Sequence, residues 1–236
     1  MNFTKVNKMK DHILTYTKEQ VLQHAKDFFV EVSGFDVQKE RHQRMMNDAL
    51  ELLEKEKPEA ELKVICTKLG KESFAEGKVI AGDVQIGCNG FSRIDAEHVL
   101  DVFICVITAG EWHLPEAKKA RHQVYMDTWG TAFVDGTKVL FEQYLMERMQ
   151  DGEYLSDPFG PGYYGMPSTD THKFAEILDM NALGVDVRDS GIMVPLKSMA
   201  AIYLVTDNEN VLPPMACSEC FGRVDGCRYC KNHKAL

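Results

Sequence analysis

The segment from residue 157 to residue 167, DPFGPGYYGMP, constrains the fold more than any other part of this 236-residue chain. It contains three prolines, three glycines and three aromatic residues. Proline fixes φ and lacks a backbone donor, while glycine permits positive φ, so the segment is incompatible with a helix or a central strand. We therefore expect a tightly shaped aromatic loop. Such a loop suits a small ligand, but a plain irregular connection between two elements fits the composition equally well.

The residues that follow this loop predict a helix and then strands. The triplet Ser-Thr-Asp at 168–170 offers N-cap candidates for a helix with apolar residues at helical spacing over 174–178. After residue 184 the pattern becomes extended, and the apolar run 199–205 predicts a buried strand.

Helical and β-like patterns follow one another along the chain without regular alternation. Thr17 begins a capping box for a first helix, a charged second helix covers about 37–55, and residues 61–107 contain short β-like runs. Because the regular βαβ alternation of a parallel fold is absent, we expect an α+β fold. Its sheet should be mixed or antiparallel, curved, and flanked by helices.

A long helical region follows at about 115–149. Gly130 and Gly136 interrupt its pattern, which predicts two helices that meet near Trp129. We divide the chain into an N-terminal helical segment, 1–60, an α+β body, 61–210, and a Cys-rich tail with a metal knuckle, 211–236.

Composition and charge argue against several classes of function. The net charge of −9 disfavours a nucleic-acid-binding protein, because phosphate contacts need a basic field. No apolar run approaches the roughly 20 residues of a membrane-spanning helix, and the N-terminus lacks the apolar block of a signal peptide. We therefore expect a cytoplasmic protein with neither nucleic acid nor a membrane as its partner.

The seven cysteines are distributed unevenly along the chain. Cys66, Cys88 and Cys105 lie in strand-like apolar stretches and are expected to be buried as small hydrophobic residues. The other four lie within fourteen residues near the C-terminus. In a reducing compartment such clustering favours a metal site over disulfides.

The tail cysteines form two Cys-x-x-Cys pairs, Cys217 with Cys220 and Cys227 with Cys230. Each pair brings two sulfurs to one point, and two pairs complete a tetrahedral site. His233 is near enough in sequence to replace one ligand. The spacing predicts a metal but leaves zinc, which would be structural, and an iron–sulfur cluster, which would carry electrons, equally open. A thiol-rich tail without metal is the remaining alternative.

A set of short motifs lies between residues 84 and 205. They are Val106-Ile107-Thr108-Ala109-Gly110, Met126-Asp127-Thr128-Trp129-Gly130-Thr131-Ala132, Pro161-Gly162-Tyr163, Ile177-Leu178-Asp179, Gly184-Val185 and Ser190-x-x-Met193-x-Pro195-x-Lys197-Ser198. Together they resemble the activation domain of cobalamin-dependent methionine synthase. The resemblance is best to standalone forms of this domain, which accompany corrinoid methyltransferases and several of which end in a Cys-rich tail.

This resemblance implies a specific chemistry. Corrinoid methyl carriers cycle through Co(I), which is occasionally oxidised to inactive Co(II). The activation domain binds S-adenosylmethionine beside the corrinoid of its partner protein, and one electron from a reductase, coupled to irreversible methyl transfer, restores methyl-Co(III). The domain then acts by proximity and orientation, without a side-chain acid, base or nucleophile.

The resemblance also implies which residues bind S-adenosylmethionine. Pro161, Gly162 and Tyr163 match the loop that holds it: backbone can approach closely at Gly162, and the Tyr163 ring can pack on adenine or near the sulfonium. Lys197 and Ser198 match a strand motif of the standalone forms, where Lys197 would meet a carboxylate. A solvated surface lysine is the alternative for Lys197.

One departure from the family pattern bears on ligand binding. Pro158 stands where the family loop has an arginine, which would hold the ligand carboxylate by a bidentate contact. Arg188, Lys197 or Arg148 would have to replace it. This departure favours a second hypothesis, a noncatalytic module that docks on a corrinoid protein and has lost S-adenosylmethionine binding. A third is a small-molecule sensor or metal-handling protein.

Overall fold

The computed structural model describes residues 11–112 and 120–212, which are built around a curved five-stranded sheet. Every neighbouring pair of strands in this sheet is antiparallel. In spatial order the strands are β1 (His12–Tyr16), β2 (Leu62–Gly70), β6 (Val99–Thr108), β10 (Ser198–Thr206) and β7 (Tyr154–Leu155). The expected α+β class is confirmed, and the sheet is antiparallel rather than mixed.

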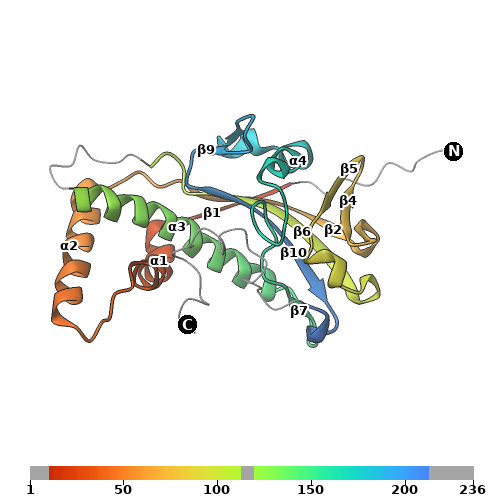
Figure 1. Ribbon diagram of the computed structural model, residues 1–236, viewed down its shortest axis with the longest axis horizontal. Helices are drawn as coiled ribbons and strands as arrows, with labels where there is room; N and C mark the ends of the chain where they lie inside the picture. The colour runs from red at the N-terminus through yellow and green to blue at the C-terminus, as the bar shows by residue number, and fades with distance from the viewer. Residues whose placement is uncertain (1–10, 113–119, 213–236) are drawn as a thin grey trace.

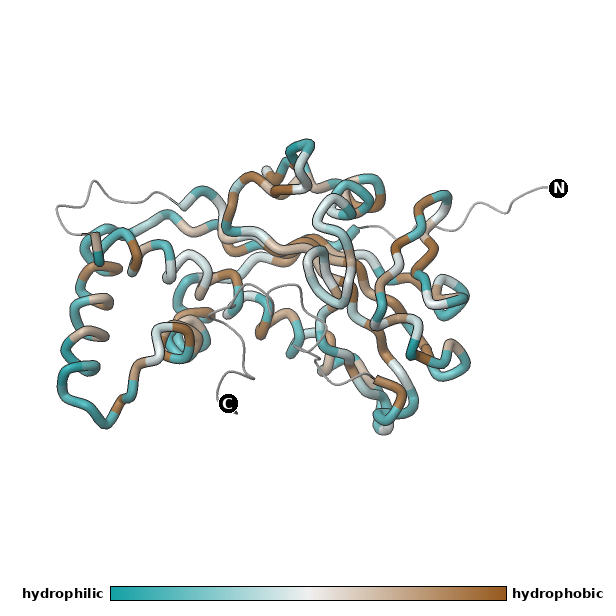
Figure 2. The backbone as a smooth tube through the Cα atoms, viewed as in Figure 1, coloured by the Kyte–Doolittle hydropathy of each residue, from teal (hydrophilic) through white to brown (hydrophobic). Residues whose placement is uncertain are grey.

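Three helices lie on one side of the sheet (Figure 1): α1 (Lys18–Ser33), α2 (Glu40–Glu56) and α3 (Ala120–Met146). Helix α3 packs against the strands, and α1 and α2 pack against α3. The predicted capping box of α1 is present, since the Thr17 hydroxyl accepts from Gln20 N and the Gln20 side chain accepts from Thr17 N. Gly34 ends the helix in the left-handed conformation. Figure 2 shows hydrophobic residues along the central strands, whereas α2 is mainly hydrophilic.

Helix α3 is continuous, so the predicted break near Trp129 is wrong. Its two glycines permit close packing instead. A β-carbon on Gly136 would lie 2.7 Å from Val21 Cγ1 and 3.1 Å from the backbone nitrogen of Ala25, so α1 approaches α3 where the side chain is missing. Gly130 similarly leaves room for the Lys197 side chain. Close packing therefore offsets the low helix propensity of glycine.

The other face of the sheet carries a second hydrophobic core. Residues 168–170, predicted as N-cap candidates, form a 3-10 turn immediately before the predicted helix. Over this face lie the short strands β3 (Phe74–Ala75), β4 (Lys78–Ala81) and β5 (Val84–Gly87), the helix α4 (Thr171–Ile177), and the hairpin of β8 (Asp186–Val187) and β9 (Met193–Val194) (Figure 1).

The buried strand predicted from the apolar run 199–205 is β10, and it contributes to both cores. Ala201 and Tyr203 pack in the helix-side core, while Ala200, Ile202 and Leu204 pack in the opposite core. This alternation follows from the period of two along a strand. It also determines the direction of each side chain near the start of β10.

The three cysteines outside the tail are only partly as expected. Cys66 and Cys105 are buried opposite each other on β2 and β6, whereas Cys88 is half-buried. Burial raises the pKa of the Cys66 thiol to about 11 and that of Cys105 well above its usual value.

We expect these pKa values to make Cys66 and Cys105 unreactive in the native protein. At pH 8 a thiol with a pKa of about 11 is ionised to only about one part in a thousand, and the thiolate is the reactive form. N-ethylmaleimide followed by peptide mass spectrometry should therefore label both residues at least about 100-fold more slowly in the native protein than in guanidinium chloride. Equal rates under the two conditions would contradict the burial of these side chains.

None of the helices in the described ranges is long and apolar enough to cross a membrane. The division of the chain at residues 60 and 210 stays a prediction. Cys217, Cys220, Cys227, Cys230 and His233 lie outside the described residues.

Candidate functional site

The Pro/Gly-rich loop runs along the outer edge of β10. Phe159 N donates to Ile202 O at 2.9 Å and Ile202 N donates to Phe159 O at 2.7 Å, which forms an isolated antiparallel bridge. Next to this bridge, a β-carbon on Gly160 would lie 2.5 Å from the carbonyl oxygen of Ala200. Only glycine fits there without a shift of the backbone. The glycine at position 160 therefore allows the loop backbone to lie directly against β10.

Backbone hydrogen bonds within the loop fix its shape. Tyr163 N donates to Gly160 O at 3.0 Å, Met166 N to Tyr163 O at 2.9 Å, and Gly162 N to Met166 O at 2.8 Å. A further bond from Asn89 N to Tyr164 O, 2.7 Å long, joins the loop to the segment after β5. The loop is therefore a tight, anchored turn, as the proline and glycine content predicted.

Two of the three loop aromatics serve as anchors. Phe159 and Tyr164 are buried, with ring centroids 4.8 Å apart, and Phe159 also lies 4.8 Å from the ring of Phe91. Tyr163 points outward and is 59% exposed. Gly162 beside it has φ of +90°, and a β-carbon there would meet nothing within 4 Å. The loop thus presents open backbone and an exposed aromatic ring at its apex, with Pro161 half-buried beside them.

Lys197 directs its side chain away from this apex, toward helix α3. Its Nζ donates to Asp127 Oδ1 at 2.7 Å and to Thr131 Oγ1 at 3.1 Å, and the side chain is only 15% exposed. This direction follows from the strand alternation, because Lys197 precedes Ser198 and shares the side of Met199. A solvated surface lysine, the alternative weighed for this residue, is not what the structure contains.

Ser198 faces the same side of the sheet as Ala200 and the loop anchors. Its hydroxyl lies 2.8 Å from Thr108 Oγ1, which also accepts from Gly110 N at 3.0 Å. These contacts hold the turn after β6 against the start of β10. The predicted ligand set is therefore divided: the loop residues and Ser198 lie on one side of the sheet, and the ammonium of Lys197 lies on the other.

The cations that would replace the arginine expected at Pro158 differ in position. Lys197 is paired with Asp127, and Arg148 lies near the C-terminal end of α3. Arg188 is exposed on the β8–β9 turn, where the neighbouring Gly191 packs against the carbonyl of Ser168. Among these three cations, Arg188 is therefore the one on the β8–β9 hairpin, which packs against the residues that follow the loop.

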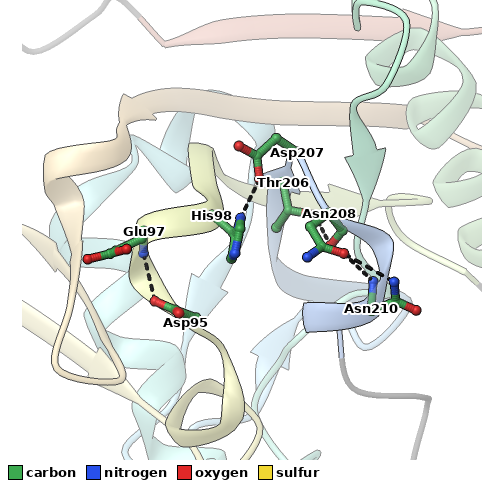
Figure 3. Close-up of polar contacts among 7 residues, drawn as sticks. All are labelled: Asp95, Glu97, His98, Thr206, Asp207, Asn208 and Asn210. Atoms are coloured by element: carbon green, nitrogen blue, oxygen red, sulfur yellow. Dashed lines mark hydrogen bonds and ion pairs between the residues drawn. The ribbon is translucent and has the colours of Figure 1, made fainter.

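The far end of β10 is held by polar contacts that sequence patterns did not single out (Figure 3). His98 Nδ1 lies 2.7 Å from Asp207 Oδ1, and Asn208 Oδ1 accepts from Asn210 N at 3.0 Å. His98 thus connects the start of β6 to the end of β10, a structural role. Within residues 11–112 and 120–212, no cluster of three or more His, Cys, Asp or Glu side chains is arranged to hold a metal ion.

Sequence reasoning missed the residues that support the candidate site. Asn89 and Phe91, which anchor the loop, lie in a short irregular segment whose composition carries no such signal. Asp127 and Thr131 were visible only as members of a motif, and their contact with Lys197 depends on how α3 packs under β10.

Comparison with known proteins supports the fold independently. No family model and no curated protein matches the chain. Among solved structures, the crystal structure of the MetH reactivation domain bound to AdoHcy aligns with 86% of this chain and 80% of that chain, with a TM-score of 0.54 and 16% sequence identity. The chain therefore shares the fold of a reactivation domain. At 16% sequence identity, this similarity is evidence for a shared fold and for nothing more specific.

Proposed function

We propose that this protein reactivates a corrinoid protein of a methyltransferase system, with S-adenosylmethionine as the methyl donor. The observation that carries the proposal is the loop apex: open backbone at Gly162 and the exposed ring of Tyr163 on a loop that is fixed to β10. The shared fold with a domain that is bound to AdoHcy supports it, since AdoHcy is what remains of S-adenosylmethionine after methyl transfer.

The proposed reaction is reductive methylation of the partner's cobalt. A reductase supplies one electron that converts Co(II) to Co(I). S-adenosylmethionine, when bound, supplies a methyl group whose bond to sulfur breaks as a bond to cobalt forms, and S-adenosylhomocysteine leaves. The chain contributes by holding S-adenosylmethionine and the partner's cobalt close together in the orientation that methyl transfer needs.

Each loop residue has a defined part in this proposal. Gly162 allows close approach of the ligand to the backbone, and Pro161 limits the motion of that backbone. The ring of Tyr163 packs on the adenine or faces the sulfonium, as an aromatic face attracts a cation. Ser198 lies on the same side of the sheet and offers a hydroxyl. Lys197 would reach the ligand carboxylate only by giving up Asp127.

Removing the exposed ring should weaken S-adenosylmethionine binding. We expect Tyr163→Ala to raise the dissociation constant about tenfold, as loss of one aromatic contact of about 1.4 kcal/mol would do. Isothermal titration calorimetry of the full chain measures it. Because Tyr163 is exposed, stability should change by less than about 1 kcal/mol.

Tyr154→Ala is the matched control, since Tyr154 is also an exposed tyrosine but lies on β7 at the other end of β10. It should leave S-adenosylmethionine binding unchanged. If the two variants behave alike, the loop apex is not the binding site.

A noncatalytic docking module is the second candidate, and Pro158 is the observation that favours it. The arginine expected there is absent, and Lys197 is already paired with Asp127. A protein that binds a corrinoid protein in a pull-down assay but shows no heat with S-adenosylmethionine would establish this candidate over the first.

The tail and the cellular setting belong to the same proposal. Zinc at Cys217, Cys220, Cys227 and Cys230 would clamp the tail, while an iron–sulfur cluster there would relay the electron from the reductase. Metal analysis of anaerobically purified protein, with a visible spectrum of the same sample, separates these possibilities. A cytoplasmic location stays a prediction.

A further inference from the structure

A cavity of about 180 Å³ lies between the sheet and the C-terminal end of α3. Its floor is the helix-side face of β2, β6 and β10, where Cys66, Phe103 and Val205 lie. One wall is formed by Leu145 and by Met149, just beyond the end of α3. The cavity therefore combines an apolar interior with strands that the fold already holds rigidly.

The cavity is large enough for a small molecule. A buried apolar cavity of about 150 Å³ is enough to bind benzene. A cavity of about 180 Å³ therefore takes a ligand of roughly six to ten non-hydrogen atoms whose hydrocarbon part replaces water against the apolar floor.

Charged side chains at the mouth decide which polar group such a ligand carries. Asp101 is paired with Lys68 at 2.6 Å, and Glu153 accepts from the backbone nitrogen of Gln150 at 2.8 Å. Both acids that line the cavity thus have partners. A cationic ligand would compete with these partners for the carboxylate oxygens.

Arg148 is the lining residue that offers a planar pair of donors. Its guanidinium lies 3.6 Å from the centroid of the Tyr144 ring, and Nη1 donates to Tyr144 O at 2.8 Å. Within the described ranges, its hydrogen bond and its 3.7 Å ion pair with Glu147 both use Nη1. The Nη2–Nε edge is left for a ligand, and this planar edge matches a carboxylate.

We propose that this cavity is a second binding site, which takes a small apolar carboxylate. The hydrocarbon part lies on Phe103 and Val205, and the carboxylate accepts from Arg148. The site is separate from the candidate loop, because Val205 and Ala200 are five residues apart on β10, about 17 Å along the strand, and the cavity is on the helix side of the sheet. A failure to detect binding at the cavity would therefore leave the proposal for the loop standing, and a failure at the loop would leave the proposal for the cavity standing.

The test uses 4-fluorobenzoate as the probe and 4-fluorobenzamide as its neutral isostere, with binding to the full chain followed by fluorine NMR. We expect 4-fluorobenzoate to bind and Arg148→Met to weaken it at least about tenfold, because the charge-assisted contact is lost. The same variant should leave 4-fluorobenzamide unchanged. Met149→Trp, which fills one wall, should weaken both probes.

Arg44→Met is the matched control, since Arg44 is an exposed arginine on α2 with one ion pair to Glu40, and it should change neither probe. If Arg148→Met fails to fold, Arg148→Lys is the alternative variant. It keeps the charge and removes only the planar Nη2–Nε edge, and it should still weaken the binding of 4-fluorobenzoate. No binding of 4-fluorobenzoate at about 10 mM, or equal binding of the two probes to every variant, would overturn the proposal.

Discussion

Phe159→Ala is expected to destabilise the protein by about 3–5 kcal/mol, the usual cost of removing a buried phenylalanine side chain. Phe159 is 1% exposed and lies between the rings of Phe91 and Tyr164, so the surrounding side chains cannot close the space that it leaves. Urea denaturation of the purified protein, followed by circular dichroism, measures the change in free energy of unfolding.

The same variant should also loosen the loop that carries Gly162 and Tyr163. Hydrogen exchange of the Met166 and Tyr163 amides, which close the loop on itself, is expected to accelerate more than exchange in α1. Tyr163→Ala is the control, because it removes an aromatic side chain from the same loop without removing an anchor. A loss of stability in Phe159→Ala no greater than in Tyr163→Ala would show that Phe159 does not hold the loop.

Trp129→Ala should have an effect of comparable size on the other face of the sheet, about 3–5 kcal/mol. Trp129 is fully buried, its ring stacks on Phe29 at 4.2 Å between centroids, and its Nε1 donates to the carbonyl of Ala49 at 3.0 Å. It therefore connects α3 to both α1 and α2. Thermal and urea unfolding of the variant would measure the loss.

Trp129→Phe separates packing from hydrogen bonding at this position. It keeps a ring against Phe29 but removes the Nε1 donor, so the expected cost is about 1–2 kcal/mol. If Trp129→Phe were as destabilising as Trp129→Ala, the hydrogen bond to α2 would account for most of the stabilisation and the stacking for little of it.

The sequence predicted those parts of the fold that depend on local pattern. The capping box at Thr17, the strand over 199–205 and the loop at 157–167 each follow from spacing or from backbone chemistry. The pattern predicted a break in α3 because glycine has a low helix propensity, whereas the helix is continuous and Gly136 is required by the approach of α1. A close contact between two distant helices leaves no local trace in the sequence.

The candidate site was predictable in its loop but not in its surroundings. Proline and glycine content was enough to expect a shaped apex at Gly162. The pairing of Lys197 with Asp127 could not be foreseen, because it depends on which side of β10 each residue faces and on which turn of α3 lies beneath it. The cavity beside Arg148 likewise arises from five separate segments of the chain.

The contact between Gly160 and the Ala200 carbonyl has a consequence for the thermodynamics of binding. A loop that is hydrogen-bonded to a central strand has already lost its conformational freedom before any ligand arrives. Association then carries little additional entropic cost from the loop, so a modest number of contacts can give useful affinity. Such a preorganised site would gain affinity at the expense of adaptability, because it accepts only ligands that fit the apex in its existing conformation.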